Sequence, residues 1–423
     1  MSYSRREFLK AGSASVALAA LGGCATVPGG GPKVVVIGAG YGGAIAAKYV
    51  RMWSDGKVDV TLVERDSEFV SCPLSNLVIG GSKQIADITV PYSGLDKWGV
   101  RRVRDEALAI DPVARTVKLA GGATLPYDRL ILSPGVDFIW DQVPSLNNAD
   151  AQAKVLHAWK AGPQTVALRR QLEAMPDGGV YVIHIPKVPY RCPPGPYERA
   201  CQVAYYFSTR KKKSKVIILD ANEEVQSKKG LFMAAFTGRY KDYIEYRPNS
   251  ELVEVDVATL TVKLDFENVK GDVLNVIPPQ YAAAIARQLG MANANARFCQ
   301  VDFLTYESTA QKNIHVLGDA IQTAPLMPKS GHMANQHGKV CASAVLALLA
   351  GQPPNAAPII ANTCYSFIDD KEVAHVSSVH AYDAEKKTMQ VVQGSGGLSP
   401  APSTLEGTYA EGWARNIWAD MLA

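Results

Sequence analysis

Near its start the chain carries a glycine-rich segment that few folds can use. Residues 33–37 read Lys-Val-Val-Val-Ile, a run of β-formers typical of a parallel strand buried on both faces. The glycines that follow fit G-x-G-x-x-G: Gly38 permits a tight turn, Gly40 a close backbone approach, and Gly43 close packing of the next helix. This order predicts a dinucleotide-binding site in which the pyrophosphate lies at a helix N-terminus.

A second apolar strand is expected at residues 58–63, and it ends in Glu64. A carboxylate at this position accepts hydrogen bonds from a ribose diol, which favours an unphosphorylated ribose over NADP. A nucleotide-binding α/β unit is indicated by the succession of a strand, the glycines, a helix, a second strand and the acid. The alternative is a glycine-rich turn with a purely structural role.

Two later segments resemble those of flavoproteins with two dinucleotide-binding domains. Residues 126–135 resemble the segment that leaves the first half of the FAD domain. Residues 314–320 resemble the second FAD motif, in which the acid after Gly318, here Asp319, binds the ribityl chain. Lys329 precedes a helix whose positive end would face the isoalloxazine and stabilise negative charge on it. The resemblance implies a glutathione-reductase-like FAD domain interrupted by an insertion.

The insertion lacks the second glycine motif that binds NAD(P)H in such proteins. A strand is expected at 179–185, but residues 186–199 carry prolines where the glycines would be, so no tight turn admits a pyrophosphate. Residues 215–220 form the next expected strand. We therefore expect a Rossmann-like skeleton that does not use NAD(P)H.

The N-terminus has the pattern of an export signal. Arg5 and Arg6 precede a short apolar run at 11–23, and this order resembles a twin-arginine signal, which implies export to the periplasm. A mobile basic tail is the alternative. Leu-Gly-Gly-Cys ending at Cys24 resembles a lipoprotein box, which would add a lipid tether; simple cleavage nearby is the alternative.

Composition excludes several classes of function. The 423 residues include 44 Lys and Arg against 40 Asp and Glu, and this net charge of +4 does not suggest a nucleic-acid binder. No C-x-x-C-H motif occurs, so no haem is expected on this chain. No cysteine or histidine cluster has zinc-ligand spacing, so no metal site is expected either.

Three cysteine segments make the resemblance more specific. Residues 71–81, 191–200 and 362–366 resemble the cysteine segments of the flavoprotein subunit of flavocytochrome c sulfide dehydrogenase. Residues 157–165 and 276–280 resemble it as well. The similarity covers nearly the whole chain after the signal.

The resemblance implies roles for four residues. Cys72 corresponds to the cysteine that holds FAD covalently through a thioether, and Cys192 and Cys364 correspond to the redox disulfide that faces the flavin. Glu198 is a candidate for handling protons nearby. Without the resemblance, Cys72 would be interpreted as a small buried hydrophobic residue and Glu198 as a capping or solvated acid. Cys192 and Cys364 would be interpreted as a structural cross-link. The resemblance assigns no role to the remaining cysteines of the body, Cys201, Cys299 and Cys341.

The implied activity is oxidation of sulfide to zero-valent sulfur or polysulfide through the disulfide and FAD. The electrons would pass to a c-type cytochrome partner chain, giving a heterodimer. One alternative is a sulfide:quinone oxidoreductase, which delivers electrons to a membrane quinone. Another is an accessory flavoprotein that activates a thiosulfate-oxidising complex.

The C-terminus bears on the quinone alternative. Trp413, Ile417 and Met421 form an apolar helical stripe, and such a stripe usually packs on its own protein. The polar face of this helix is not basic enough to favour an anionic membrane.

The expected fold is α/β, with two Rossmann-like three-layer domains and a C-terminal α+β interface domain. The export signal and leader occupy residues 1–30. The FAD domain is expected at 31–150 and 272–351, the second Rossmann-like domain at 151–271, and the interface domain at 352–423.

Overall fold

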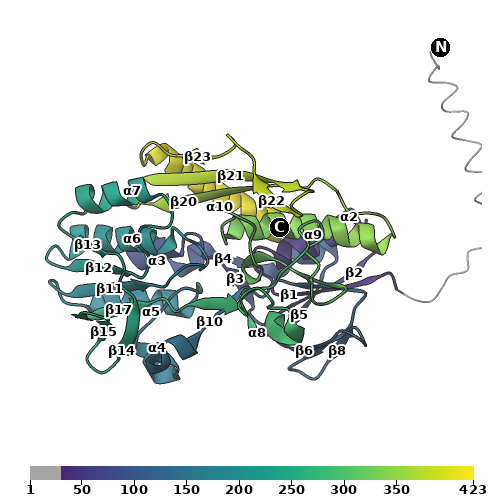
Figure 1. Cartoon of the computed structure of the whole chain (residues 1–423), viewed down its shortest axis with the longest axis horizontal. Helices are drawn as coiled ribbons and strands as arrows, with labels where there is room; N and C mark the ends of the chain where they lie inside the picture. The colour runs from purple at the N-terminus through teal and green to yellow at the C-terminus, as the bar shows by residue number, and fades with distance from the viewer. Residues whose placement is uncertain (1–29) are drawn as a thin grey trace, which may run out of the picture. The chain divides into compact units, whose positions relative to one another are not determined.

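The predicted strand and glycine segment form the centre of a parallel sheet in the computed structural model, which describes residues 30–423 (Figure 1). This first sheet has five strands in the spatial order β19 (Ile314–Val316), β9 (Arg129–Leu132), β1 (Lys33–Ile37), β2 (Asp59–Glu64) and β5 (Arg101–Arg104). β1 pairs in parallel with both neighbours, so that Val35 lies beside Thr61 and Leu130. Because β1 is central and buried, its sequence is apolar throughout its interior.

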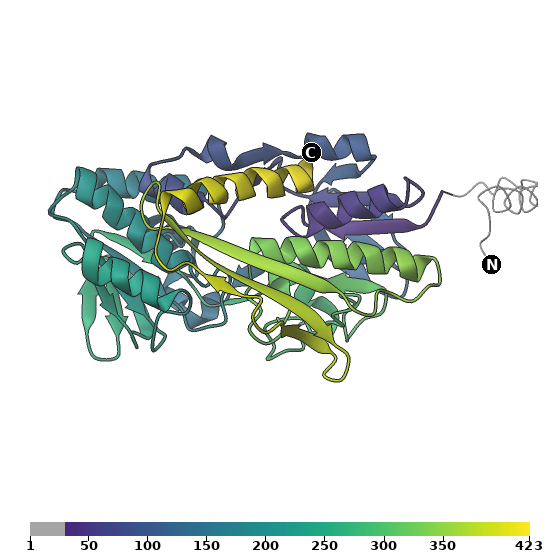
Figure 2. The same cartoon turned by 90° about the horizontal axis from the view of Figure 1, so that it is seen from above.

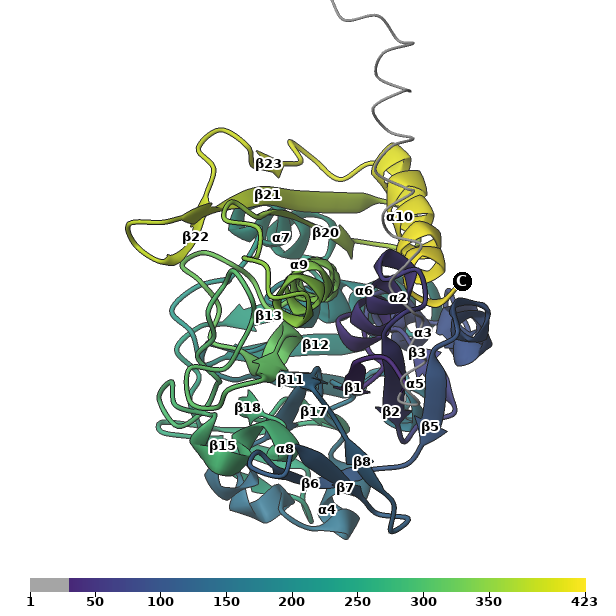
Figure 3. The same cartoon turned by 90° about the vertical axis from the view of Figure 1, so that its right-hand side faces the viewer.

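Helices and a small antiparallel sheet cover the two faces of the first sheet. Helices α2 (Gly43–Trp53) and α9 (Gly331–Leu349) pack together on one face. Figures 1 and 3 show a meander on the other side, made of β6 (Ala107–Asp111), β7 (Thr116–Leu119) and β8 (Thr124–Pro126). The hairpin of β3 (Glu68–Val70) and β4 (Thr89–Pro91) flanks helix α3 (Ser75–Gly80).

A second parallel sheet follows in the insertion. Its strand order is β13 (Ile244–Arg247), β12 (Lys215–Asp220), β11 (Val180–Ile185) and β17 (Val273–Val276). Its other elements are α4 (Ala149–Lys154), α5 (Pro163–Ala174), α6 (Gly195–Arg210), α7 (Lys229–Ala234), η5 (Ala235–Arg239), β14 (Leu252–Asp256), β15 (Thr261–Leu264) and β16 (Asn268–Lys270). The predicted fold class, with two Rossmann-like units, is confirmed.

Two boundaries differ from those expected. β17 pairs with β11, Tyr181 opposite Val273, so it belongs to the second sheet although the FAD domain was expected to resume at 272. Val143 and Ala151 pack in the core that includes Leu274, so the second unit also begins before residue 150. Neither the mixed sequence at 143–151 nor the short Val-Leu-Asn-Val at 273–276 reveals which sheet buries it. The strand β10 (Val136–Phe138) leads out of the first unit, and β18 (Gln280–Ala282), which pairs antiparallel with it, leads back. Helix α8 (Ala284–Arg287) follows β18.

The C-terminal segment lies across both units. Its antiparallel sheet contains β20 (Ile359–Phe367), β21 (Val373–Asp383), β22 (Thr388–Val391) and β23 (Gly397–Leu398). β20 contacts α6 of the second unit and α9 of the first. The last helix, α10 (Thr404–Leu422), lies beside α2, as the yellow helix in Figures 2 and 3 shows.

Helix α10 is anchored at its C-terminal end. The Lys48 ammonium donates to the carbonyl oxygens of Asp420 and Ala423, each at 2.7 Å, where a positive charge complements the helix dipole. Ile417 and Met421 are buried, so the predicted apolar stripe packs on its own protein.

Residues 32–423 form one compact unit. The predicted export signal and Cys24 lie outside the described residues. Among residues 30–423, no helix is long and apolar enough to cross a membrane. In the same residues, no three His, Cys, Asp or Glu side chains lie close enough together to hold a metal ion.

Four buried histidines make the free energy of unfolding depend on pH. Burial lowers the pKa of His157 and His337 to about 3, and of His184 and His315 to about 4. The unfolded chain takes up protons near pH ~6.5, while the folded protein excludes them until lower pH. We therefore expect the free energy of unfolding to fall as the pH drops from about 6.5 to about 4. Urea midpoints at pH 7 and pH 5 measure this.

The His337→Phe variant isolates one of these groups. Neither ring nitrogen of His337 has a hydrogen-bond partner among the described residues, and the ring stacks on Tyr306 with centroids 4.8 Å apart. Phenylalanine keeps that contact and removes the titration. The stability lost between pH 7 and pH 5 should shrink by about 2 kcal/mol; an unchanged loss would show that His337 is protonated in the folded protein.

Candidate active site

A cavity of about 760 Å³ lies where the two sheets and the C-terminal segment meet. This volume is typical of small-molecule and cofactor sites. The cavity brings together the predicted site residues except Gly43, which packs behind the wall; those that line it are Gly38, Gly40, Glu64, Cys72, Cys192, Glu198, Gly318, Asp319, Lys329 and Cys364.

The glycine loop forms one wall, and each glycine has a distinct environment. Gly38 has φ +90°, and a Cβ there would lie 2.4 Å from the Ser133 carbonyl oxygen. A Cβ on Gly43 would lie 1.8 Å from the Gly38 carbonyl oxygen, so α2 packs against the loop without space for a side chain. A Cβ on Gly40 would meet nothing within 4 Å, because Gly40 faces the open cavity.

Glu64 stands at the end of β2, beside the glycine loop. Its Oε2 accepts a hydrogen bond from the Ala39 N–H at 2.8 Å, and its Oε1 accepts one from the Asp66 N–H at 3.1 Å. These bonds hold the carboxylate at the cavity edge, where a nucleotide ribose would lie above the loop.

The second FAD motif also lines the cavity. Gly318 has φ +72°, and Asp319 follows it with a buried Oδ1 that has no partner among the described residues. The Lys329 ammonium donates to the Asp319 and Ile321 carbonyl oxygens. Burial lowers the pKa of Lys329 to about 7, although Asp319 opposes the shift.

These walls fit an FAD. Gly40 leaves the backbone of the loop open at the start of α2, where N–H groups favour a pyrophosphate. The unpartnered Asp319 Oδ1 is an acceptor for a hydroxyl donor such as the ribityl chain supplies. When bound, a flavin supplies a two-electron acceptor that can release electrons one at a time.

Arg191 links Cys72 to the second FAD motif. Its Nη2 lies 2.6 Å from the Cys72 Sγ, and its Nη1 lies 3.8 Å from Asp319 Oδ2. Burial alone would lower the pKa of Arg191, but the Cys72 sulfur and Asp319 more than offset it, so the pKa is raised. A permanent positive charge therefore lies against the Cys72 sulfur.

Cys192 and Cys364 reach the cavity from different elements. Cys192 lies in the loop between β11 and α6, has φ +55°, and donates its N–H to the Lys329 carbonyl oxygen at 2.8 Å. Cys364 lies on β20, its Sγ 3.5 Å from Asn362 Nδ2. Both are free thiols in this structure, so the predicted disulfide is not formed in it. Burial, Cys364 and Glu198 raise the pKa of Cys192 to about 12, against the effect of Arg191.

Glu198 and Gln202, one turn apart on α6, hold β20 in place. Glu198 Oε1 accepts a hydrogen bond from the Phe367 N–H at 2.9 Å, and Gln202 Nε2 donates to the Phe367 carbonyl oxygen at 3.1 Å. Asn76 Nδ2 donates to the other Glu198 oxygen at 2.8 Å. Burial raises the pKa of Glu198, while these two donors oppose the shift. Cys364 is thereby positioned by the helix that follows Cys192.

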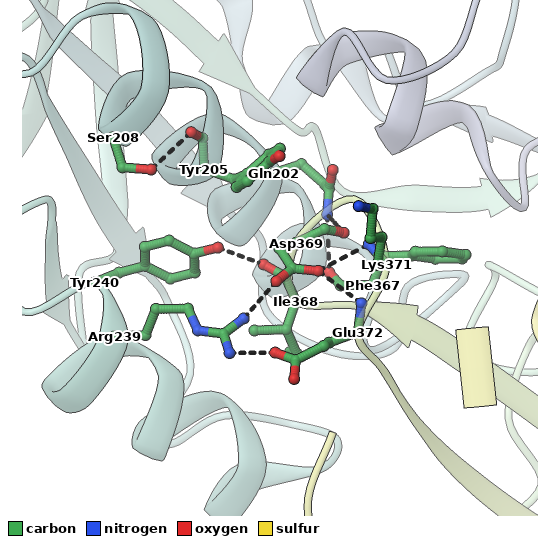
Figure 4. Close-up of polar contacts among 10 residues, drawn as sticks. All are labelled: Gln202, Tyr205, Ser208, Arg239, Tyr240, Phe367, Ile368, Asp369, Lys371 and Glu372. Atoms are coloured by element: carbon green, nitrogen blue, oxygen red, sulfur yellow. Dashed lines mark hydrogen bonds and ion pairs between the residues drawn. The ribbon is translucent and has the colours of Figure 1, made fainter. Parts of the chain in front are cut away.

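Figure 4 shows that the turn after β20 is held further along by the second unit. Arg239 of η5 pairs with Asp369 at 2.7 Å and also with Glu372, and Tyr240 donates to the Ile368 carbonyl oxygen at 2.7 Å. Gln202 Nε2 also donates to the Asp369 carbonyl oxygen at 2.8 Å. These contacts fix the strand that carries Cys364 on the unit that carries Cys192.

Several residues of this site were not predicted from the sequence. Arg191 stands next to Cys192 in a recognised segment, which could have drawn attention to it. Lys228 is buried behind the cysteines, and Trp413 lines the cavity from α10; no local pattern indicates either position. The remaining cysteines of the body are buried and do not line the cavity: Cys201, Cys299 and Cys341.

Three family models match the chain. "Pyridine nucleotide-disulphide oxidoreductase" matches residues 32–173. "Sulfide dehydrogenase (flavocytochrome c) flavoprotein chain, central" matches residues 165–278. "Flavocytochrome c sulphide dehydrogenase, flavin-binding" matches residues 356–422. The matched regions include the glycine loop, Cys192 and Cys364.

Curated relatives agree with these models. The flavoprotein chain of sulfide dehydrogenase (flavocytochrome c) from Chlorobaculum thiosulfatiphilum is 54% identical over 46 residues, 11% of this chain and 94% of that sequence. The sulfide-quinone reductase of Aquifex aeolicus is 24% identical over 362 residues, 78% of this chain and 80% of the relative. The mitochondrial sulfide:quinone oxidoreductase of Dictyostelium discoideum is 23% identical over 302 residues, 68% of this chain but 65% of the relative.

A solved structure shares the fold. The sulfide:quinone oxidoreductase from Aquifex aeolicus superposes with a TM-score of 0.73 at 18% sequence identity, over 92% of this chain and 91% of that one. Fold and site thus define an FAD flavoprotein of the pyridine nucleotide-disulphide oxidoreductase superfamily. Within it, the chain belongs to the family of the flavoprotein chain of flavocytochrome c sulfide dehydrogenase.

Proposed function

We propose that this flavoprotein oxidises sulfide to zero-valent sulfur or polysulfide and passes the electrons to a c-type cytochrome. The observation that carries the proposal is the presence of Cys192 and Cys364, from distant parts of the chain, in the same cavity as the dinucleotide loop. A disulfide between them would offer an electrophile to sulfide directly beside the FAD site. The family membership supports the same reaction.

The cysteines carry the sulfur chemistry. Hydrosulfide attacks one sulfur of the oxidised pair, which forms a persulfide there and releases the other cysteine as a thiolate. Glu198 lines the same cavity, and its burial raises the pKa of its carboxyl, which suits it to hold a proton released from the substrate. The hydrogen bonds of Glu198 and Gln202 to the Phe367 backbone keep the two cysteine segments together while the disulfide is open.

Cys72 is the proposed attachment point of the FAD. Its sulfur lines the cavity and lies 2.6 Å from Nη2 of the Arg191 guanidinium, which holds it at the FAD site. After acid precipitation, the wild-type protein should keep its yellow colour in the pellet, while a Cys72→Ala variant should release its flavin to the supernatant. Release from the wild type would contradict covalent attachment.

We propose that the electrons pass to a c-type cytochrome chain and not to NAD(P)⁺. The loop after β11 supports this, because its prolines replace the glycines of a nicotinamide site and it delivers Arg191 and Cys192 to the FAD cavity.

For the location, we propose export to the periplasm by the twin-arginine pathway, with a lipid tether at Cys24 as a variant. Two other functions stay in competition: a sulfide:quinone oxidoreductase, favoured by the relatives named above, and an accessory flavoprotein for a thiosulfate-oxidising complex.

An anaerobic titration distinguishes these functions. Sulfide is added to the purified protein while the flavin absorbance is followed, and oxidised cytochrome c or a short-chain quinone is then added separately. We expect sulfide to bleach the flavin and the cytochrome alone to restore it. Recovery with quinone alone would replace the proposal by quinone reduction, and the absence of bleaching would leave the accessory role.

A further inference from the structure

Lys228 is a buried lysine that has no carboxylate partner among the described residues. The residue is 6% exposed, and its ammonium donates to the Ser366 hydroxyl oxygen at 2.7 Å. Among residues 30–423, no aspartate or glutamate lies within ion-pair distance of it. A buried charge that lacks a counter-ion is strongly destabilising, so another negative group must accompany it for the ammonium to persist.

The position of Ser366 indicates which group this is. Ser366 and Cys364 are two residues apart on β20, so their side chains project from the same face of the strand. Burial lowers the pKa of Lys228, while Cys364, Glu198, Cys192 and, more weakly, Glu406 oppose the shift. Cys364 is the largest of these opposing influences. Glu198 is already bonded on both of its oxygens, to the Phe367 N–H and to Asn76.

The two cysteines therefore differ in electrostatic environment. Cys364 shares its strand face with the residue that binds the Lys228 ammonium. Cys192 is buried near the Glu198 carboxylate, and burial, Cys364 and that carboxylate raise its pKa to about 12 against the effect of Arg191. When a disulfide is attacked, the sulfur whose anion is better stabilised leaves faster.

From this asymmetry we propose that Lys228 is the counter-ion of the Cys364 thiolate, so that sulfide attacks Cys192 and expels Cys364. The step is HS⁻ plus the Cys192–Cys364 disulfide giving a Cys192 persulfide (S–SH) and a Cys364 thiolate. One S–S bond forms and one breaks, the charge is −1 on both sides, and no further oxidant is needed. The inference rests on the proposed function and specifies the order of attack within it.

A trapping experiment on the wild-type holoprotein locates the persulfide. The air-oxidised protein is mixed rapidly with one equivalent of sulfide under anaerobic conditions, acidified to stop thiol exchange, alkylated, and analysed by peptide mass spectrometry. We expect the extra sulfur on Cys192 and simple alkylation of Cys364. Extra sulfur on Cys364 would overturn the inference and leave the proposed function intact. Extra sulfur on neither cysteine would overturn the proposed function itself.

A second measurement tests Lys228 without turnover. In the fully reduced protein, the rate of Cys364 alkylation is followed against pH for Lys228→Met, Lys228→Arg and the wild type. Loss of the cation should slow alkylation of Cys364 at pH 7 about tenfold, while arginine should restore the wild-type rate. The matched control is Lys229→Met, because Lys229 is exposed and pairs with Glu224. A wild-type profile in a folded Lys228→Met variant would contradict the assignment.

Discussion

Substitution of Cys192 or Cys364 by serine is expected to lower sulfide-dependent cytochrome c reduction by ~10³-fold or more, because loss of either sulfur removes the electrophilic disulfide. The flavin content should stay at the wild-type value, since neither cysteine belongs to the glycine loop or to the Asp319 wall. Initial rates of cytochrome reduction, with the flavin-to-protein ratio measured on the same samples, give the result. A rate within about tenfold of the wild type would exclude this mechanism.

The control for this experiment is Cys201→Ala. Cys201 lies on α6, as Glu198 does, and is fully buried, but it does not line the cavity. Removing its sulfur perturbs the same helix without touching the proposed chemistry. We expect turnover within about twofold of the wild type, so a large loss here would assign the serine effects to packing of α6 instead.

The Gly43→Ala variant is expected to lose bound flavin and about 3 kcal/mol or more of stability. The new Cβ would lie 1.8 Å from the Gly38 carbonyl oxygen and 3.2 Å from the Ser133 Cβ. Because the closest contact is backbone, no side-chain rotation relieves it, and α2 must move away from the glycine loop. The flavin-to-protein ratio and the urea midpoint measure the two effects.

Gly412→Ala provides the comparison. Gly412 lies inside α10, and a Cβ there would meet nothing within 4 Å. Alanine lowers the entropy of the unfolded chain and favours the helix, so stability should rise by about 0.5–1 kcal/mol with full flavin content. If Gly43→Ala behaved like Gly412→Ala, the close packing of α2 on the loop would not be needed for FAD binding.

The parts of the fold that could be predicted are those encoded by neighbouring residues. The strand expected at 33–37 is β1, and the strand expected at 215–220 is β12, because an unbroken apolar run records burial on both faces. The positive φ of Gly38 likewise follows from the local turn. The second sheet continues to β17, beyond the expected end of the insertion, because the short Val-Leu-Asn-Val at 273–276 fits either sheet equally well.

The site depended on contacts that no local pattern records. Cys192 and Cys364 lie in elements that meet only through the packing of β20 on α6, and their pairing was inferred from the family resemblance. Lys228 and Lys229 are adjacent and identical in type, yet the first is buried and the second is exposed. Lys228 stands just before α7 with a left-handed backbone, φ +54°, which becomes evident only in the folded chain.

The docking of α10 also bears on the order of events during synthesis. Trp413 of this helix lines the cavity, Trp418 donates to the Tyr41 hydroxyl oxygen at 3.1 Å, and Lys48 holds its C-terminal end. The partners of these contacts, in and just after the glycine loop, leave the ribosome early, whereas residues 404–422 emerge after everything that precedes them. A nascent chain can therefore complete the first sheet while one side of the nucleotide cavity still lacks its wall. That wall is finished only when α10 has been translated and has docked beside α2.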